Sequence, residues 1–229
     1  MSIKNPRKAV AALGKGSRLS DVAYARIFEV MYERKLPAGA FVSQSQLVEL
    51  TGVPVAPLRD ALRTLEAEGV LTIRPQAGIQ FIKPGMELAR STYQFRGIVE
   101  AAAVAVYAET ADDSDILDLL RRHREVEQSL ERNGLTAQSA ADLELLEESL
   151  HGTIVASLNN PLIDTSYRRI RNYLRLLRLD RKVTVPLALR SLREHMVVLE
   201  ACRARNPAAA VAAIQAHFAA ALQRNLGLY

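Results

Sequence analysis

The hydrophobic residues of positions 43–82 change their spacing along the chain, and the change predicts a helix-turn-helix followed by a β-hairpin. An apolar stripe with a period of three to four residues marks the second helix, at Leu58, Leu62 and Leu65. Two short apolar runs then flank the turn 75–78, as in a strand–turn–strand unit. A helix-turn-helix with a small β wing is a DNA-reading unit whose second helix enters the major groove.

Local signals support these boundaries. Ser43 and Gln46 have the spacing of a capping box at the start of the first motif helix. Gly52 allows the positive φ that a sharp corner between helices needs, and Pro57 falls in the first turn of the second helix, where it removes no helical hydrogen bond. A preceding helix is expected over 20–35.

From position 86 onward the pattern is helical and shows no strand signal. Turn residues separate six expected helices, at 87–109, 112–132, 137–158, 160–181, 185–205 and 207–226. Helices of this length predict an antiparallel bundle. The fold class is therefore mainly α, with an N-terminal winged helix-turn-helix (18–85), a C-terminal all-helical domain (86–229) and a basic flexible arm (1–17).

Charge distinguishes the two expected domains. Residues 1–85 hold twelve Lys and Arg against seven Asp and Glu, whereas residues 86–229 hold eighteen of each. The positive excess lies on the part expected to meet DNA phosphates. The chain has one cysteine, no long uncharged apolar run and no apolar core in its basic N-terminus, so we expect a cytoplasmic protein without a transmembrane helix or secretory signal.

Three of the four histidines fall on apolar helical stripes: His151, His195 and His217. Glu147 precedes His151 by four residues, so both side chains aim at one point. A single histidine of this kind is more often a hydrogen-bonded core residue than a metal ligand. Three buried imidazoles and a carboxylate each need a polar partner, however, and one divalent ion satisfies all four. The fourth histidine, His123, lies in a charged run and is expected on the surface.

Two parts of the sequence carry a family resemblance. Residues 18–84 resemble the winged helix-turn-helix of GntR-type bacterial transcription regulators, through LPAGAFVSQSQL, GVPVAPLRDALRTLEAEGVL and the wing ending AGIQFI. Nearly all of 87–226 resembles the effector domain of the FadR branch, called the FCD domain, through RGIVEAAA, LHGTIVASLNNPLI and EHMVVLEACRARNPAAAVAAIQAHF.

The resemblance implies a metal site of one carboxylate and three histidines, and Glu147 stands where the family usually has Asp. Such a ligand set suits zinc or nickel, and also iron or manganese. The resemblance further implies a small carboxylate effector near the metal, a homodimer and a double-stranded DNA operator. Arg96 matches an effector-domain arginine of the family and suits a carboxylate; Arg171 is a weaker effector-binding candidate.

The expected DNA contacts lie on both motif helices and the wing, at Ser43, Gln44, Ser45, Val55, Ala56, Arg59, Arg63, Arg74, Gln76 and Gly78. Of the contacting residues usual in the family, only Arg59 is retained. Val55 and Ala56 can meet a thymine methyl group but cannot read guanine as arginine does. We therefore expect an operator with more A·T character, or an affinity that depends more on phosphate contacts.

The sequence thus predicts a DNA-binding transcription regulator that acts as a repressor. Its operator affinity is expected to be controlled by a small carboxylate effector at a metal site. A pure metal sensor is a second reading. A metal-dependent hydrolase that uses the carboxylate and the three histidines is a third, although no further buried base or nucleophile lies beside them and the DNA-reading motif would be unexplained.

Overall fold

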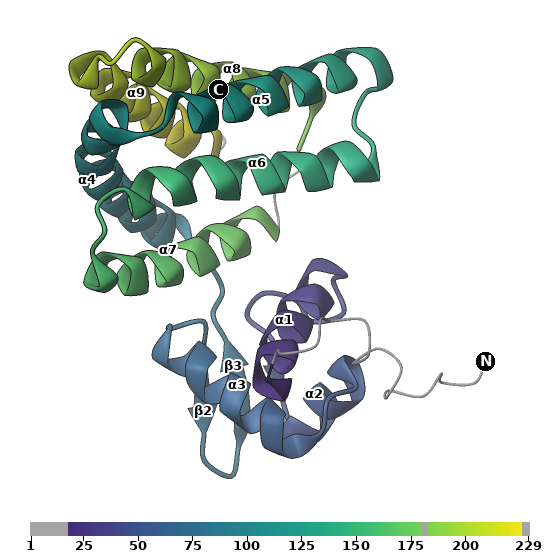
Figure 1. Cartoon of the computed structure of the whole chain (residues 1–229). Helices are drawn as coiled ribbons and strands as arrows, with labels where there is room; N and C mark the ends of the chain where they lie inside the picture. The colour runs from purple at the N-terminus through teal and green to yellow at the C-terminus, as the bar shows by residue number, and fades with distance from the viewer. Residues whose placement is uncertain (1–17, 180–182, 226–229) are drawn as a thin grey trace. The chain divides into compact units, whose positions relative to one another are not determined.

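The computed structural model describes residues 18–179 and 183–225, in two compact units (Figure 1). The first unit contains the described residues up to Gly85 together with Arg171–Leu179. The second contains Met86–Ile170 and the described residues from 183 onward. The arm predicted at 1–17 lies outside the described residues.

Apart from Arg171–Leu179, the described residues of the first unit form three helices and a small antiparallel sheet. In chain order its elements are α1 (Leu19–Tyr32), β1 (Phe41–Val42), α2 (Gln44–Thr51), α3 (Val55–Ala67), β2 (Leu71–Arg74) and β3 (Gly78–Phe81). The strand order is β1-β3-β2, with Leu71 opposite Phe81 and Val42 opposite Ile79. The sequence predicted the hairpin β2–β3 but not β1, because two residues carry no readable period.

The predicted local signals have their expected geometry. The Ser43 hydroxyl accepts a hydrogen bond from the Gln46 amide (3.2 Å), and the Gln46 side chain accepts one from the Ser43 amide (2.8 Å), which closes the capping box. Gly52 adopts φ 67° at the C-terminus of α2. Leu58, Leu62 and Leu65 are buried, as the stripe predicted.

The second unit is helical throughout its described residues. Its helices are α4 (Met86–Thr110), α5 (Asp113–Asn133), α6 (Ala137–Ala156), α7 (Pro161–Leu179), α8 (Val185–Arg203) and α9 (Pro207–Asn225); α7 continues beyond Ile170 into the first unit. Most predicted ends agree within two residues, and the predicted ends at 181 and 226 lie outside the described residues.

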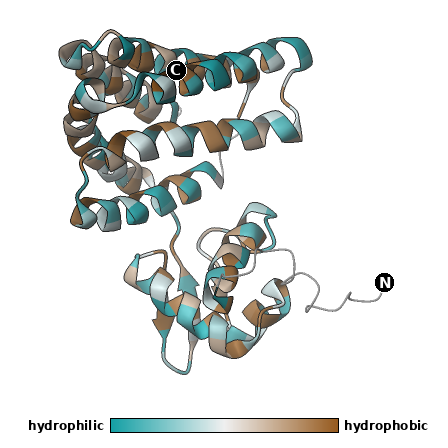
Figure 2. Cartoon of the chain, viewed as in Figure 1, coloured by the Kyte–Doolittle hydropathy of each residue, from teal (hydrophilic) through white to brown (hydrophobic). Residues whose placement is uncertain are grey.

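Hydrophobic and hydrophilic residues both occur along the helices of the bundle (Figure 2), and they separate onto different faces most clearly in α5 and α7. The helix α9 packs against both α4 and α8, and α5 lies between α8 and α6 (Figure 1). Several polar groups are buried among the hydrophobic side chains inside the bundle, including Arg96, Glu100 and all four histidines. Such groups need partners, and these partners define the candidate site.

Candidate functional site

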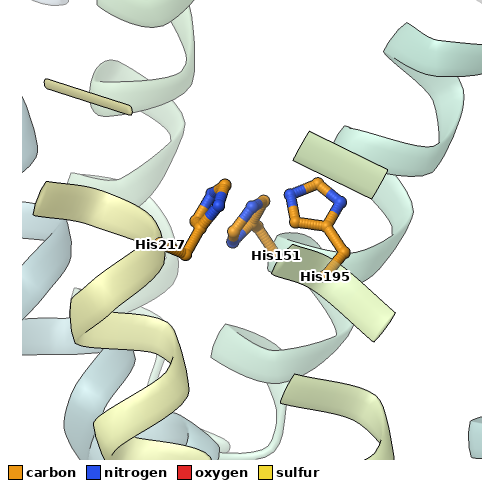
Figure 3. Close-up of side chains that lie close together, drawn as sticks. All are labelled: His151, His195 and His217. Atoms are coloured by element: carbon orange, nitrogen blue, oxygen red, sulfur yellow. The ribbon is translucent and has the colours of Figure 1, made fainter. Parts of the chain in front are cut away.

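Three histidines from three helices meet in the interior of the bundle. His151 comes from α6, His195 from α8 and His217 from α9, and Figure 3 shows their rings gathered together. All three are buried, and one nitrogen of each lies within 4.8 Å of the corresponding nitrogens of the other two. The structure therefore brings together the three histidines that the sequence singled out.

The Nδ1 atom of each of these histidines has a hydrogen-bond partner. His151 Nδ1 donates to Glu100 Oε2 (2.5 Å), and His217 Nδ1 donates to Glu194 Oε2 (2.9 Å), since a carboxylate can only accept. His195 Nδ1 lies 3.3 Å from the Nε2 atom of a further buried histidine, His123. With Nδ1 engaged in this way, Nε2 is the nitrogen that each ring has available.

Two of these Nε2 atoms, on His151 and His195, are buried and have no hydrogen-bond partner among the described residues. The carboxylate of Glu147 faces both, with oxygen–nitrogen distances of 3.5 Å to His151 and 3.6 Å to His195. Buried imidazole nitrogens without a donor are costly, and a cation at their meeting point would satisfy them. The residues present thus fit a divalent metal ion.

A buried ion-pair network supports the His151 side of this group. Arg96 Nε lies 2.6 Å from Glu100 Oε1, its Nη1 lies 3.4 Å from Glu147 Oε1, and the Tyr167 hydroxyl donates to Glu100 (2.6 Å). Burial raises the pKa of Glu100, but the charges of Arg96 and His151 and the hydrogen bonds outweigh burial and hold that pKa at about 2. Arg96 is therefore already engaged with carboxylates of its own chain.

Glu194 has the equivalent role beside His217. It receives two hydrogen bonds from Arg224, at 2.8 and 2.7 Å, in addition to the bond from His217. Burial raises the pKa of Glu194, but the hydrogen bonds from His217 and Arg224 lower it to about 2. The sequence analysis missed both Glu100 and Glu194. The spacing of Glu100, four residues after Arg96, was a signal that could have found it.

Burial favours the neutral form of His195 and His217. Burial lowers the pKa of His195 well below its ordinary value, and the neighbouring His217 lowers it further, against the opposing charge of Glu147. Burial also lowers the pKa of His217, although its hydrogen bond to Glu194 opposes that shift. A neutral imidazole is the form that binds metal ions.

The prediction that His123 lies on the surface was wrong. Its exposed fraction is 0%, because it continues the buried stripe of α5 formed by Ile116, Leu119 and Leu120. The flanking charged residues Arg121 and Arg124 point outward and concealed this period. Burial lowers the pKa of His123, with the hydrogen bond to the backbone of Leu119 acting against that effect.

The predicted DNA contacts on α3 lie on its exposed side. Val55, Ala56, Arg59 and Arg63 are exposed, opposite the buried leucines of the same helix. Arg59 Nε donates to Gln44 Oε1 on α2 (3.2 Å), which connects the two motif helices on this surface. These positions are available to DNA, as a recognition helix requires.

The remaining predicted DNA contacts lie at the start of α2 and in the wing. The Ser45 and Ser43 hydroxyls are 3.0 Å apart. Arg74 is exposed at the end of β2, and Gln76 is exposed in the turn between β2 and β3. Gly78 also has a structural role: at φ +148°, a Cβ atom there would lie 2.9 Å from the ring of Phe41. The close contact with β1 explains why this position holds glycine.

The two predicted effector-binding arginines differ in location. Arg96 adjoins the histidine group through Glu100 and Glu147. Arg171 lies on the part of α7 that belongs to the first unit. Its role in effector binding stays a prediction.

Comparison with protein families assigns both units. Residues 19–81 match the model described as bacterial regulatory proteins, gntR family, and residues 91–220 match the FCD domain. The second match alone covers more than half of the chain. No helix in the described part of the chain is both long and apolar enough to cross a membrane.

Relatives and solved structures agree with this assignment. The chain is 23% identical over 197 residues to YdhC of Bacillus subtilis (strain 168), described as an uncharacterized HTH-type transcriptional regulator, with 85% of each protein covered. E. coli McbR/YncC has the same fold (TM-score 0.72, 16% identity, covering 93% of this chain and 99% of that one). So does a GntR regulator from Rhodococcus sp. RHA1 (TM-score 0.71, 19% identity, covering 92% and 98%).

Proposed function

We propose, since this chain belongs to the GntR family of bacterial regulatory proteins and carries an FCD domain, that a divalent metal ion and a small carboxylate effector control its binding to operator DNA. The chain is a transcription regulator, not an enzyme, as are its family and its relatives. The observation that carries the proposal is a set of three buried histidines whose ring nitrogens meet and whose Nδ1 atoms are engaged. Two of them, His151 and His195, present Nε2 to Glu147.

The metal ligands in this proposal are Glu147, His151, His195 and His217. Three imidazoles and one carboxylate suit zinc or nickel, with iron and manganese as the other candidates. When bound, the ion supplies a positive charge and coordination positions for oxygen ligands. Glu100 and Glu194 orient two of the imidazoles from behind, as the outer hydrogen-bond partners of metal-binding histidines do.

The charges of the group support an anionic effector. Counting the carboxylates as ionised and the histidines as neutral, the three cations Arg96, Arg190 and Arg224 balance the carboxylates of Glu100, Glu147 and Glu194. A divalent ion then adds two positive charges that these residues do not balance. A carboxylate group would neutralise part of that charge, and buried charge without a partner is unfavourable.

We propose that the regulator acts as a repressor and that it forms a homodimer. One winged helix-turn-helix reads only a few base pairs, and specific binding requires two heads on two half-sites. Effector control then requires that the effector bind the DNA-competent and DNA-incompetent arrangements with different affinity.

The test is fluorescence anisotropy of the purified chain with DNA that flanks its own gene, with unrelated DNA as the control. The protein is stripped with chelator, reloaded with zinc or nickel, and titrated with acetate, lactate, succinate and citrate. We expect a carboxylate to change operator affinity only in the metal-loaded protein, and expect His195→Ala to bind operator without responding. A response to carboxylate in chelator or in His195→Ala would contradict the proposal, and a response to metal alone would favour a metal sensor.

A further inference from the structure

His123 on α5 belongs to the buried polar group around the histidines, and the metal proposal gives it no role. Its exposed fraction is 0%, and its two ring nitrogens contact different helices. Nδ1 lies 2.7 Å from the carbonyl oxygen of Leu119 within α5, and Nε2 lies 3.3 Å from Nδ1 of His195 on α8. The His123 and His195 rings are 5.4 Å apart, edge to face.

The carbonyl group of Leu119 determines which ring nitrogens carry a hydrogen in the hydrogen-bonded series Leu119–His123–His195. A carbonyl oxygen can only accept, so the hydrogen of a neutral His123 must be on Nδ1. The Nε2 atom of His123 is then an acceptor, and Nδ1 of His195 must be the donor to it. His195 therefore carries its hydrogen on Nδ1 and a lone pair on Nε2, the atom that faces Glu147 at 3.6 Å.

The opposite arrangement is disfavoured. If His195 instead held its hydrogen on Nε2, its Nδ1 could only accept, and His123 would need hydrogens on both nitrogens to satisfy Leu119 and His195 together. That form of His123 is a cation with no exposed surface, and none of its contacts described above is a carboxylate. Burying an unpaired charge is strongly unfavourable.

We propose that His123 is a positioning residue for the metal site, which fixes His195 in the tautomer whose Nε2 lone pair is directed at the ion. This inference depends on the proposed function, because it concerns the same metal group. His123 has the place that Glu100 takes behind His151 and Glu194 takes behind His217. The three imidazoles are thus supported by two carboxylates and one histidine that is itself anchored to the backbone.

The direct test is nitrogen NMR on the full-length, histidine-labelled protein in chelator, with His195 assigned by its loss in His195→Ala. Long-range couplings distinguish Nδ1–H from Nε2–H imidazole. We expect His195 in the Nδ1–H form in the wild-type protein. An Nε2–H form would overturn the proposal. This measurement does not depend on metal uptake, so it decides the role of His123 even if the metal part of the proposed function fails.

Variants test the consequence for metal binding, measured as zinc affinity in competition with a chromophoric chelator. His123→Leu removes the acceptor, and we expect it to weaken zinc binding roughly 10- to 100-fold. His123→Gln offers an amide oxygen to His195 and should restore most of that loss. Leu120→Ala, equally buried on α5, controls for general damage to the helix. Wild-type zinc affinity in His123→Leu would overturn the proposal, whereas absence of zinc binding in the wild type would overturn the metal site itself.

Discussion

At the scale of single residues, the buried charges around the histidines depend on one another. Glu100 has no exposed surface and accepts hydrogen bonds from Arg96, His151 and Tyr167. Each of these donors would lose its partner if the carboxylate were removed. Breaking a buried pair in this way is far more costly than removing an exposed one.

We therefore predict that Glu100→Gln lowers the free energy of unfolding by about 3 kcal/mol or more, because Arg96 remains as a buried cation. Urea unfolding followed by circular dichroism measures this change. The matched control is Glu109→Gln on the exposed side of the same helix, with an expected effect below about 0.5 kcal/mol. Equal effects of the two substitutions would show that the buried network contributes no special stability.

The lowered pKa values of the histidines predict how metal-free stability depends on pH. Because burial lowers the pKa of His123, His195 and His217, the unfolded chain binds more protons than the folded chain once the pH falls below about 6.5. The contribution of these histidines to stability in chelator should therefore be fully present above about pH 7 and should decrease as the pH falls from about 7 to about 5. The pKa values of Glu100 and Glu194 are lowered to about 2. The stability that these two carboxylates contribute is therefore lost at a lower pH than the contribution of the histidines.

Urea unfolding at a series of pH values, in chelator, measures this dependence. A free energy of unfolding that stays flat between about pH 7 and pH 5 would contradict it. The triple substitution of His123, His195 and His217 by Gln is the reference, since an amide does not titrate and should remove the slope.

The residues of the candidate site could be predicted only in part from the sequence. Spacing on apolar stripes was enough to single out His151, His195 and His217, because each stripe has an uninterrupted period. His123 was missed because charged neighbours obscured the period of α5. Glu194 follows Arg190 by four residues and pairs with it, but its role beside His217 could not be assigned in advance, because His217 and Arg224 lie on another helix and only the packing of α8 against α9 brings them to Glu194.

At the scale of elements, the β-sheet depends on a close contact that only glycine permits. Gly78 has φ +148°, and an added Cβ would lie 2.9 Å from both the Phe41 ring and the Val42 carbonyl oxygen. We predict that Gly78→Ala destabilises the hairpin by about 1–3 kcal/mol, seen as faster hydrogen exchange in β2 and β3. Gly85→Ala is the control, because nothing lies within 4 Å of its Cβ position. Unchanged exchange in Gly78→Ala would show that β1 can move away without cost.

The exposed face of α3 carries a second prediction at this scale. Arg59→Ala should weaken operator binding by about tenfold and reduce its dependence on salt, because it removes a cation from the face that enters the groove. Arg124→Ala, an exposed arginine of α5 paired with Glu200, removes the same charge from the other unit. If both substitutions weaken binding equally, net charge rather than the recognition helix explains the affinity.

The elements themselves could be predicted with good accuracy. Six helices of the second unit were expected within a few residues of their observed bounds, because their apolar stripes are long and the breaks carry Asn, Gly or Pro. The strand β1 was not expected, since its two residues form a strand only through pairing with β3, nearly forty residues further along the chain.

At the scale of the whole molecule, a DNA-reading unit and a helical unit with a polar centre occur in one chain. The proposed ligand control requires a surface for DNA and an interior site for the signal, and the two units are the candidates for these two parts. The proposed homodimer would present two such surfaces to two half-sites. The metal ion is the component on which the rest of this account depends.

Metal content after equilibrium dialysis tests that component most directly. The wild-type chain and a His151→Ala/His195→Ala variant are stripped, dialysed against the same buffered zinc solution and analysed by inductively coupled plasma mass spectrometry, with Leu120→Ala as the folding control. We predict about one ion per chain in the wild type and in Leu120→Ala, and close to none in the double variant. No bound ion in the wild type, or equal zinc in the double variant, would show that these histidines are not a metal site.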